Sequence, residues 1–384
     1  MKIAAVIAEY NPFHNGHAYH LQKVREFADC VVVVMSGHLV QRAELAFYDK
    51  WTRTKAALLG GGDLVIELPA LFSYASAERF AHGAIDLLNH LGCVQTVSFG
   101  SEAGNLHLLE NLAQDCIHLH KSQSMQNLLK QGYSYPAARQ KALGERGNAL
   151  SLPNNTLGVE YIKAAKEMNA ALSFHTVARI GAMHDAEQTG KFSSSSYLRA
   201  HPSEMPIAIP PSILPFFYAK SCCQSDNKRL ELPTMVRLRQ LSKENFLELP
   251  DVTEGLENRL FRAAQQAQTL EEFLSLAKTK RYTHSRLRRI ALSALLGIHK
   301  QEIHQLPHYA RVLGFNNRGR QALRQMQQVS ALLITPDFPT IYRKYPMLAK
   351  WDKLATDLFF LTTKQRRPCG EDFRRRPIQM NSLA

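Results

Sequence analysis

The first half of the chain alternates short apolar runs with amphipathic stretches. The runs at residues 3–8 and 30–35 are continuous and rich in β-branched residues, which is typical of strands buried on both faces of a sheet. Strands are predicted at residues 3–8, 30–35, 63–68, 94–99 and 172–180, and helices at 49–59, 76–91, within 106–129 and at 154–168. Strands separated by helices predict an α/β fold with a parallel sheet and right-handed crossovers.

The pattern changes after about residue 205. Prolines crowd the connection, at Pro202, Pro206, Pro210, Pro211 and Pro215, and helical spacing dominates beyond it. Helices are predicted at residues 235–241, 255–267, 270–277, 284–296 and 319–333. We therefore expect two domains, an α/β domain at 1–205 and a mostly helical, basic domain at 206–384.

The turn after the first strand carries the most distinctive polar residues. Asn11 and Pro12 break the strand, and His14, Gly16 and His17 precede a predicted helix. A helix N-terminus offers free N–H groups and a positive dipole end, which suit phosphate, and histidines there could stabilise developing negative charge. The alternatives are ordinary polar loop residues or a metal-binding pair, but the position directly after the first strand favours a nucleotide.

Composition narrows the class of protein. Hydrophobic content of 45% and charged content of 21% are typical of a soluble globular protein. No apolar run approaches the roughly 20 residues that span a membrane, and the first run ends without a cleavage site, so it is interpreted as a core strand. The six cysteines form no C-x-x-C pair, so we expect free thiols in a cytoplasmic protein and no zinc.

A net charge of +14 suggests a polyanionic partner. The densest segment, residues 278–289, has six basic residues and no acid, with Tyr282 as a possible stacking group. Its basic residues are Lys278, Lys280, Arg281, Arg286, Arg288 and Arg289. A solvated helix face is the alternative, yet such a face usually mixes both signs of charge, so contact with nucleic-acid phosphates is favoured.

Further candidates lie where the carboxyl ends of parallel strands should meet. They are Gly100, Asn154, Asn155, Arg179, Ser194, Ser195 and Arg199. The asparagines could instead cap a helix, Arg179 could be a surface arginine, and the serines could form a flexible linker. Asp63 and Glu67, beside the third strand, could hold a metal-bound water or merely cap the strand.

Several nucleotide and hydrolase signatures are missing from the sequence. There is no G-x-x-x-x-G-K-[ST], no G-x-G-x-x-G after a strand and no G-x-S-x-G. Histidines at a helix end instead suggest attack on an α-phosphate with pyrophosphate leaving. Such a reaction depends on positioning and charge stabilisation rather than on a covalent enzyme nucleophile.

Two motifs together carry a resemblance. Residues 9–17, E-Y-N-P-F-H-N-G-H, and 194–199, S-S-S-Y-L-R, resemble the H-x-G-H and S-S-T-x-I-R motifs of the nucleotidyltransferase and class I aminoacyl-tRNA synthetase superfamily. More narrowly, residues 34–37, 40–42, 49–51, 63–69, 99–102, 153–158, 311–315 and 319–320 look like the tRNA(Met) cytidine acetate ligase family. Two features depart from that family pattern. Ala43 replaces a common glycine, and the serine motif has four serines followed by Tyr197 where a threonine and a branched residue are usual.

The resemblance implies a Rossmann-like, HUP-type nucleotidyltransferase domain and an ATP-dependent acetate ligase. Such an enzyme forms acetyl-adenylate and acetylates the N4 amine of the wobble cytidine of elongator tRNA(Met). His14 and His17 would hold the phosphates as catalytic residues. ATP would contact Ile7, Ala8, Glu9, Tyr10, Asn11, Pro12, Phe13, His14, Asn15, Gly16, His17, Ala18, Tyr19, His20, Gly100, Asn154 and Arg179.

The expected nucleotide site also includes Ser194, Ser195 and Arg199, because hydroxyl and N–H groups at a helix start followed by an arginine suit a phosphate. The implied partners are elongator tRNA(Met) and acetate, with neither DNA nor a membrane. Magnesium is expected because the leaving pyrophosphate is highly charged, although no residue is assigned to hold it.

Two other functions stay open. A small-molecule adenylyltransferase of coenzyme biosynthesis fits the first half equally well, but it would not need the basic segment. A non-catalytic RNA-binding protein on the same fold would not need both histidines and Arg199.

Overall fold

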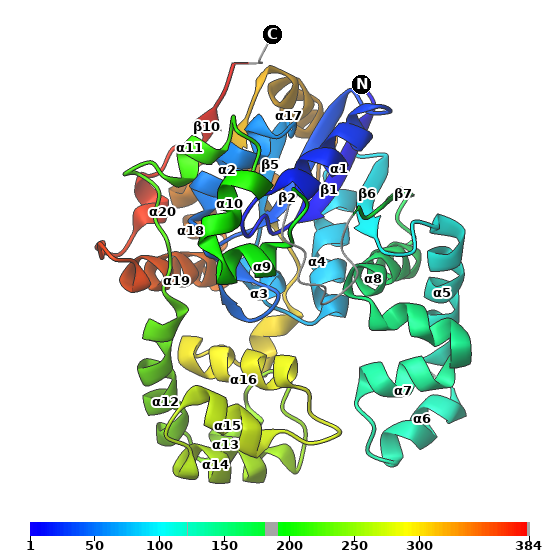
Figure 1. Cartoon of the computed structure of the whole chain (residues 1–384), viewed down its shortest axis with the longest axis vertical. Coiled ribbons are helices and arrows are strands. Elements are labelled where there is room, and N and C mark those ends of the chain that lie inside the picture. Colours follow the sequence, from blue (N-terminus) through cyan, green and yellow to red (C-terminus); the bar gives the residue numbers. More distant parts are fainter. Residues whose placement is uncertain (121, 181–190, 382–384) are drawn as a thin grey trace.

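The computed structural model describes residues 1–120, 122–180 and 191–381, and an eight-stranded sheet forms its centre (Figure 1). The strand order is β10-β8-β5-β2-β1-β6-β7, with β9 beside β8. The strands are β1 (Ile3–Ala8), β2 (Cys30–Ser36), β5 (Leu64–Leu68), β6 (Thr96–Ser101), β7 (Ser173–Ala178), β8 (Tyr309–Phe315), β9 (Leu333–Thr335) and β10 (Ile378–Gln379). All pairings are parallel except that of β5 with β8. The five predicted strands are confirmed with ends within two residues.

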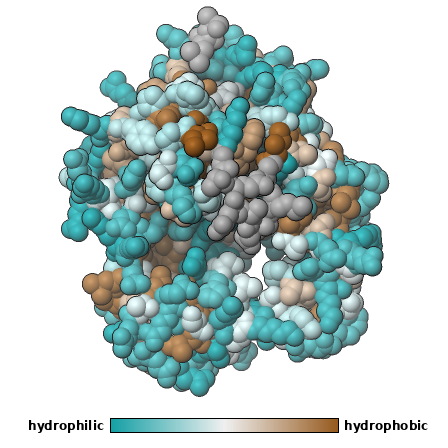
Figure 2. All heavy atoms as spheres, in the orientation of Figure 1, coloured by the Kyte–Doolittle hydropathy of each residue, from teal (hydrophilic) through white to brown (hydrophobic). Residues whose placement is uncertain are grey.

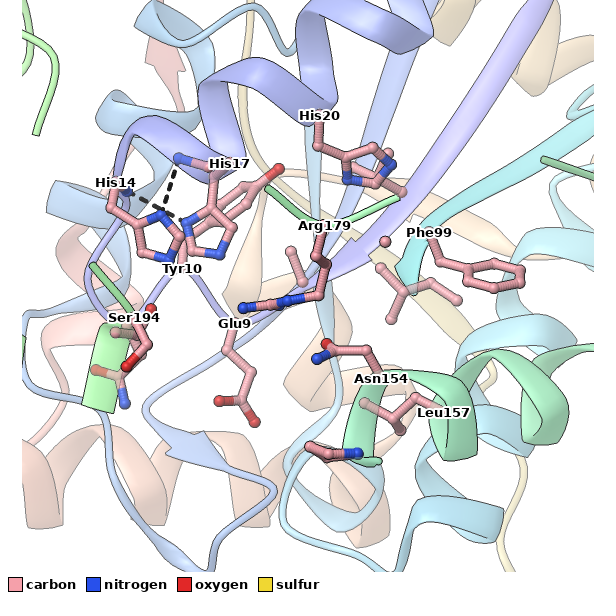
Figure 3. Close-up of a pocket in the computed structure, with 18 of the residues that line it drawn as sticks. Glu9, Tyr10, His14, His17, His20, Phe99, Asn154, Leu157, Arg179 and Ser194 are labelled. Carbon is pink, nitrogen blue, oxygen red and sulfur yellow. Dashed lines mark hydrogen bonds between the residues drawn. The ribbon is translucent and has the colours of Figure 1, made fainter. Parts of the chain in front are cut away.

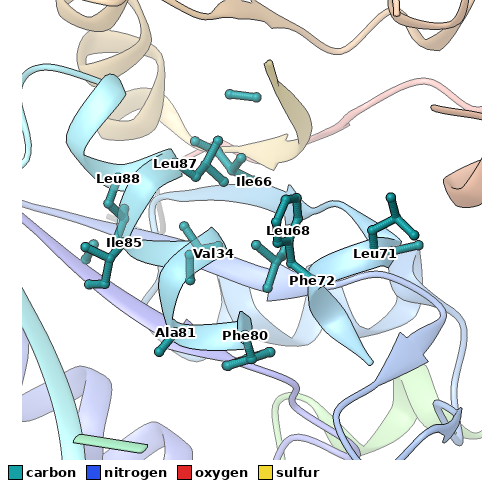
Figure 4. Close-up of a cluster of buried hydrophobic side chains, with 14 of the residues drawn as sticks. Val34, Ile66, Leu68, Leu71, Phe72, Phe80, Ala81, Ile85, Leu87 and Leu88 are labelled. Carbon is teal, nitrogen blue, oxygen red and sulfur yellow. The ribbon is translucent and has the colours of Figure 1, made fainter. Parts of the chain in front are cut away.

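The sheet is buried on both faces, which explains the continuous apolar runs. All seven residues of β2 are buried. Successive side chains of a strand point to opposite faces, so Val32 and Val34 pack in one core cluster and Val31 and Val33 in the other. Figure 4 shows the first cluster, where Val34 and Ile66 of the sheet meet apolar side chains of the adjacent helices.

Helices cover the two faces of the sheet in two layers. Apolar side chains of α3 (Ala70–Ser73), α4 (Ala77–His90), α5 (Leu106–Leu119), α8 (Pro153–Glu167), α17 (Asn317–Val329), α18 (Phe338–Lys344) and α19 (Pro346–Thr362) join the first cluster. Those of α1 (Asn15–Arg25), α2 (Lys50–Leu59), α9 (Ser195–Ala200), α10 (Met205–Ala208) and α11 (Leu214–Phe217) join the second. This layering confirms the expected α/β architecture.

A helical unit with an apolar core of its own lies beyond the sheet. It consists of α12 (Glu231–Gln240), α13 (Lys243–Leu247), α14 (Leu256–Gln266), α15 (Leu270–Ala277) and α16 (His284–Leu296). A second small lobe contains α6 (Gln123–Lys130), α7 (Tyr135–Ala142) and the 3-10 helix η1 (Gly144–Ser151). The remaining elements are β3 (Leu39–Val40), β4 (Glu44–Leu45), η2 (Pro202–Glu204), η3 (Asn227–Leu230), η4 (Lys300–His304) and α20 (Glu371–Arg374). No helix in the described parts of the chain is long and apolar enough to span a membrane.

The sheet contains strands from both sides of the expected domain boundary at residue 205. The chain returns to it after the helical unit, and β8 lies antiparallel to β5. Residues 206–384 therefore do not form one helical body, although the helical unit within them agrees with the expectation. The run at 309–315 was not predicted as a strand, because only its pairing with β5, more than 240 residues earlier in the chain, distinguishes it from a buried loop.

Candidate active site

A cavity of about 670 Å³ lies where the carboxyl ends of β1, β6 and β7 meet the start of α1, α8 and α9 (Figure 3). Ligands of open parallel sheets bind beyond the carboxyl ends of the strands. One wall is polar and carries His14, His17 and Arg179. Another wall is apolar and is made by Phe80, Phe99, Leu157, Tyr161 and Val177. The cavity therefore offers both a charged end and an apolar slot to a ligand.

His14 and His17 form a capping box at the N-terminus of α1. His14 is the N-cap residue, and its Nδ1 accepts a hydrogen bond from the Gly16 amide at 3.1 Å. His17 Nδ1 accepts from the His14 amide at 3.2 Å, which completes a capping box. The rings stack with centroids 3.7 Å apart.

These two bonds determine which ring nitrogen carries the proton. A backbone N–H can only donate, so both Nδ1 atoms act as acceptors, and in a neutral imidazole the proton then lies on Nε2. Figure 3 shows the remaining nitrogens of both rings turned away from the capping bonds. The pair thus presents two N–H donors in fixed positions beside the open N-terminus of α1, the arrangement that stabilises developing phosphate charge.

Burial keeps both imidazoles neutral. Burial, helped by the charge of Arg179, lowers the pKa of His14 to about 3. The pKa of His17 is also well below its ordinary value because of burial and the neighbouring His14, Arg179 and His20. The histidines therefore act here as hydrogen-bond donors rather than as permanent cations.

Gly16 and Tyr10 fix the shape of this turn. A Cβ added at Gly16 would lie 3.0 Å from Cε1 and 3.1 Å from Nδ1 of His14, so a larger residue would require the folded-back ring to shift by a few tenths of an ångström. Tyr10 has a φ of 49°, in the left-handed region, and its ring packs edge-on against Phe13 and His17. The turn is thus held by side-chain packing as well as by backbone bonds.

The opposite side of the cavity is formed by β6, β7 and α8. Gly100 lies beside Arg179, with 3.6 Å between the site of a Cβ at Gly100 and Arg179 Cγ. Glu102 accepts from Asn154 Nδ2 at 2.6 Å and from the Asn155 amide at 2.9 Å. The N-cap residue of α8 is Leu152, so neither asparagine is the predicted cap; Asn154 lines the cavity, whereas Asn155 is buried and bonds to Ala103 and Ala149.

The serine motif supports the turn as well as lining the cavity. Ser194 is the N-cap of α9, which places the predicted helix start correctly. Ser195 Oγ donates to the Pro12 carbonyl at 3.2 Å. Arg199 donates to the Asn11 carbonyl at 2.7 Å and pairs with Glu44 at 3.3 Å, so part of its donor capacity holds the turn in place.

Most of the predicted nucleotide contacts lie together in this cavity. Its lining includes Ile7, Ala8, Glu9, Tyr10, Asn11, His14, Gly16, His17, Tyr19, His20, Gly100, Asn154, Arg179, Ser194, Ser195 and Arg199. Pro12, Phe13, Asn15 and Ala18 are not among its lining residues: Phe13 is fully buried in the core, and Asn15 bonds to the carbonyls of Lys191 and Ile207. Sequence reasoning missed the apolar wall, because its residues look like ordinary core positions until the fold turns them toward the cavity.

Asp63 and Glu67 lie outside the site. Asp63 accepts from the Val31 amide and Asn316 and pairs with Arg25, while Glu67 pairs with Lys50 and Arg311. In the described ranges no three His, Cys, Asp or Glu side chains are grouped so that they could hold a metal ion, and all six cysteines are free thiols. Because both carboxylates are bound by protein groups, the structural alternative is favoured over a metal-bound water at Asp63 or Glu67.

The basic segment lies far from the histidines in sequence and divides into two groups. Lys278, Lys280, Arg281 and Arg288 are exposed. Arg286 and Arg289 are half-buried and bound to Asp251, through its carbonyl at 2.8 Å and its carboxylate at 2.6 Å. Acids from outside the segment thus neutralise part of it, which the sequence of 278–289 could not reveal.

One further expectation about the basic segment is corrected. Tyr282 is buried in the core of the helical unit, with the Arg286 guanidinium over its ring at 5.1 Å, so the ring cannot stack on a base. Near the end of the described chain, Arg367 and Arg375 both pair with Glu371 at 3.1 Å. Apolar burial explains the difference at Tyr282.

Comparison with known proteins agrees with this geometry. The family model described as HIGH Nucleotidyl Transferase matches residues 1–372. The tRNA(Met) cytidine acetate ligase of Thermoanaerobacter sp. (strain X514) is 37% identical over 97% of this chain and 98% of its own, and that of Acetivibrio thermocellus is 37% identical over 99% and 100%.

Two solved structures superpose on the whole chain. Thermotoga maritima TmcAL bound with alpha-thio ATP matches with a TM-score of 0.89 and 32% identity, and its apo form with 0.90 and 33%, in each case over 100% of both chains. These relatives favour a ligase acting on RNA over a small-molecule adenylyltransferase. The chain belongs to the HIGH nucleotidyltransferases and, among them, to the tRNA(Met) cytidine acetate ligase family.

Proposed function

We propose that this protein uses ATP to activate acetate as acetyl-adenylate and transfers the acetyl group to N4 of the wobble cytidine of elongator tRNA(Met), with release of pyrophosphate and AMP. The observation that carries the proposal is the histidine pair at the mouth of α1, whose Nε2 donors are fixed by two backbone amides. The names of the family members supply the acceptor and the acid.

The first step places the ATP phosphates between the histidine pair and Arg179. An acetate oxygen attacks the α-phosphorus, and the bond to the leaving pyrophosphate breaks. Negative charge grows on the phosphate oxygens, and the two Nε2–H groups together with the guanidinium are aimed at that charge. No covalent enzyme intermediate is needed, since positioning and charge stabilisation supply the catalysis.

Magnesium would enter with ATP rather than into a cage of protein side chains. Magnesium commonly keeps several waters and binds substrate phosphates through few protein ligands. The lack of an acidic or histidine cluster in the described ranges fits that mode of binding. The metal would supply further neutralisation of the departing pyrophosphate.

The exposed part of the basic segment is the proposed tRNA-binding surface. Lys278, Lys280, Arg281 and Arg288 would contact phosphates, while Arg286 and Arg289 would hold the segment on Asp251. Lys280 also reaches the small lobe, with Nζ 3.7 Å from the centre of the Tyr133 ring. Figure 2 shows a mostly hydrophilic surface, hollowed between the small lobe and the helical unit, where an RNA strand would pass.

The test is an assay of both half-reactions. Purified protein, ATP and labelled acetate should give acetate-dependent ATP–pyrophosphate exchange, and adding elongator tRNA(Met) should give acetylated RNA. A panel of short carboxylic acids and a second tRNA serve as specificity controls. Transfer that required acetyl-CoA, or exchange with no transfer to any RNA, would refute the proposal.

A further inference from the structure

Two carboxylates line the cavity, and their surroundings differ. Both carboxylate oxygens of Glu102 accept hydrogen bonds at the start of α8, Oε1 from Asn154 and Oε2 from Asn155. Glu9, directly after β1, accepts one bond through Oε1 from the Gln41 amide at 2.8 Å. Its Oε2 has no hydrogen-bonding partner among the described residues. Glu9 is therefore the lining acid that retains a free acceptor.

The position of Glu9 separates it from the phosphate end of the cavity. Figure 3 shows its carboxylate pointing away from His14 and His17, into the space between Ser194 and Asn154. The loop that carries Gln41 and Arg42 borders the same part of the cavity. A second substrate that approaches here can reach a group activated at the histidines without displacing the phosphates.

We propose that Glu9 receives the exocyclic amine of the acceptor cytosine and accepts its proton during acyl transfer, a role that rests on the function proposed above. A carboxylate is the usual hydrogen-bond partner of cytosine N4, which is a donor. Uracil presents a carbonyl oxygen at the same place, and two acceptors repel each other. The same side chain thus selects cytosine over uracil and accepts the proton of its amine.

The transfer step balances without a further reactant. N4 attacks the carbonyl carbon of acetyl-adenylate and forms the new C–N bond. The bond from that carbon to the phosphate oxygen breaks, and AMP leaves with the electron pair. The amine proton passes to a Glu9 oxygen and then to solvent. Because the N4 lone pair is delocalised into the ring, removing this proton assists the attack.

Charges from several elements act on Glu9. Burial raises its pKa above the ordinary glutamate value, and the nearby carboxylate of Glu44 acts in the same direction. The Gln41 amide and the positive charges of Arg199 and Arg53 oppose this rise, and the buried hydroxyl of Tyr161 also faces Glu9. A base with a raised pKa is a better proton acceptor at neutral pH than an ordinary exposed carboxylate.

The experiment compares Glu9→Gln with wild type in the two half-reactions measured separately. Acetate-dependent ATP–pyrophosphate exchange reports on the first, and transfer from synthetic acetyl-adenylate to elongator tRNA(Met) on the second. We expect transfer to be slowed by about 100-fold or more, the usual contribution of a general base, and to be slowed far more than exchange. The rate of transfer by the wild type should fall as pH is lowered through the pKa of Glu9. This decrease should be absent in the variant.

Glu26→Gln is the matched control, because it removes an exposed carboxylate that pairs with Lys23 and does not line the cavity. It should retain both half-reactions. Normal exchange by Glu9→Gln would itself show that the variant folds. Equal loss of exchange and transfer, or transfer at the wild-type rate, would overturn the role of Glu9 alone. Failure of wild type to acetylate the RNA would refute the proposed function and this role with it.

Discussion

At the residue scale, two backbone amides determine the chemistry of the histidine pair. The Gly16 and His14 amides donate to the two Nδ1 atoms, and burial keeps the rings uncharged. The same bonds that start α1 thus select the tautomer that donates toward the cavity. In the proposed function, helix capping and phosphate binding would depend on the same two side chains.

Variants at His14 can separate these two roles. His14→Ala removes both cap and donor, so we expect exchange to fall about 100-fold or more and stability by about 1 kcal/mol. His14→Asn keeps a good N-cap acceptor but lacks Nε2–H. It should unfold near the wild-type temperature in calorimetry while its exchange stays as low as that of His14→Ala.

His17→Ala should likewise slow exchange and leave tRNA binding unchanged. His118→Ala, at an exposed position on α5, provides a control with the same chemical change. Full exchange activity in His14→Asn would show that capping alone, rather than donation to phosphate, explains the pair.

Gly16→Ala tests the space that the His14 ring needs. The added Cβ would meet the ring at 3.0–3.1 Å, so the ring must shift and its Nε2 donor loses alignment. Misplacement on this scale is expected to slow ATP–pyrophosphate exchange roughly 10- to 100-fold. Thermal unfolding should change little, because alanine favours the helix. Wild-type exchange would mean that the ring position is unimportant.

At the element scale, a buried group of four charges joins the catalytic sheet to the end of the chain. Lys50 of α2 lies 2.6 Å from Glu67 of β5 and 2.8 Å from Asp372 of α20. Arg311 of β8 lies 3.1 Å from Glu67 and 2.6 Å from Asp372. All four side chains are at most 3% exposed, so each depends on the others for its partners.

Asp372→Asn should therefore be strongly destabilising. Removing one member leaves Lys50 and Arg311 buried with too little negative charge, which costs roughly 3–5 kcal/mol in the free energy of unfolding. Urea unfolding measures this loss, and Glu271→Gln, which breaks the exposed pair with Arg288, should change little by comparison. A comparable effect of the two changes would contradict the assignment.

The pH dependence of the same variant has a definite sign. Burial alone would raise the pKa of Asp372, but the charges of Arg311 and Lys50 outweigh it and hold the pKa below the ordinary value. The unfolded chain then binds the proton more readily, so this stabilisation is present above about pH 4 and is lost as pH falls through the folded-state pKa. Asp372→Asn should lack this part of the acid sensitivity.

At the scale of the whole molecule, the chain leaves the sheet and returns to it. The helical unit α12–α16 lies between β7 and β8 in the sequence. Lys280 of its basic segment, residues 278–289, contacts Tyr133 of the small lobe. Figure 1 shows both lobes on the same side of the sheet. This arrangement would allow one RNA to contact the basic segment and approach the cavity.

Lys280→Ala and Arg281→Ala should each weaken tRNA binding and lower the slope of log K against log salt by about 0.7 to 1. Fluorescence anisotropy over a salt series measures both. Arg324→Ala, on α17 at the opposite end of the molecule in Figure 1, is the matched control for loss of an exposed positive charge. An unchanged slope in both loop variants would exclude phosphate contacts there.

The sequence by itself determined the features that depend on a short window. Residues 3–17 alone predicted β1, the turn and the histidines at the start of α1, because a buried strand and a helix start leave local signals. The predicted bounds of α15 and α16 were correct for the same reason. The acetate and tRNA assignments came from resemblance, since no local pattern specifies either.

Only the tertiary structure decided which residues share the site. Phe80, Phe99 and Leu157 have the spacing of core residues, and only the packing of α8 against β6 and of α4 against α8 brings them to the cavity. Asp251 neutralises Arg289 from outside the basic segment, and β8 becomes a strand through its pairing with β5. Such contacts join positions far apart in the chain, so their energies are absent from any local pattern and exist only once the chain has folded.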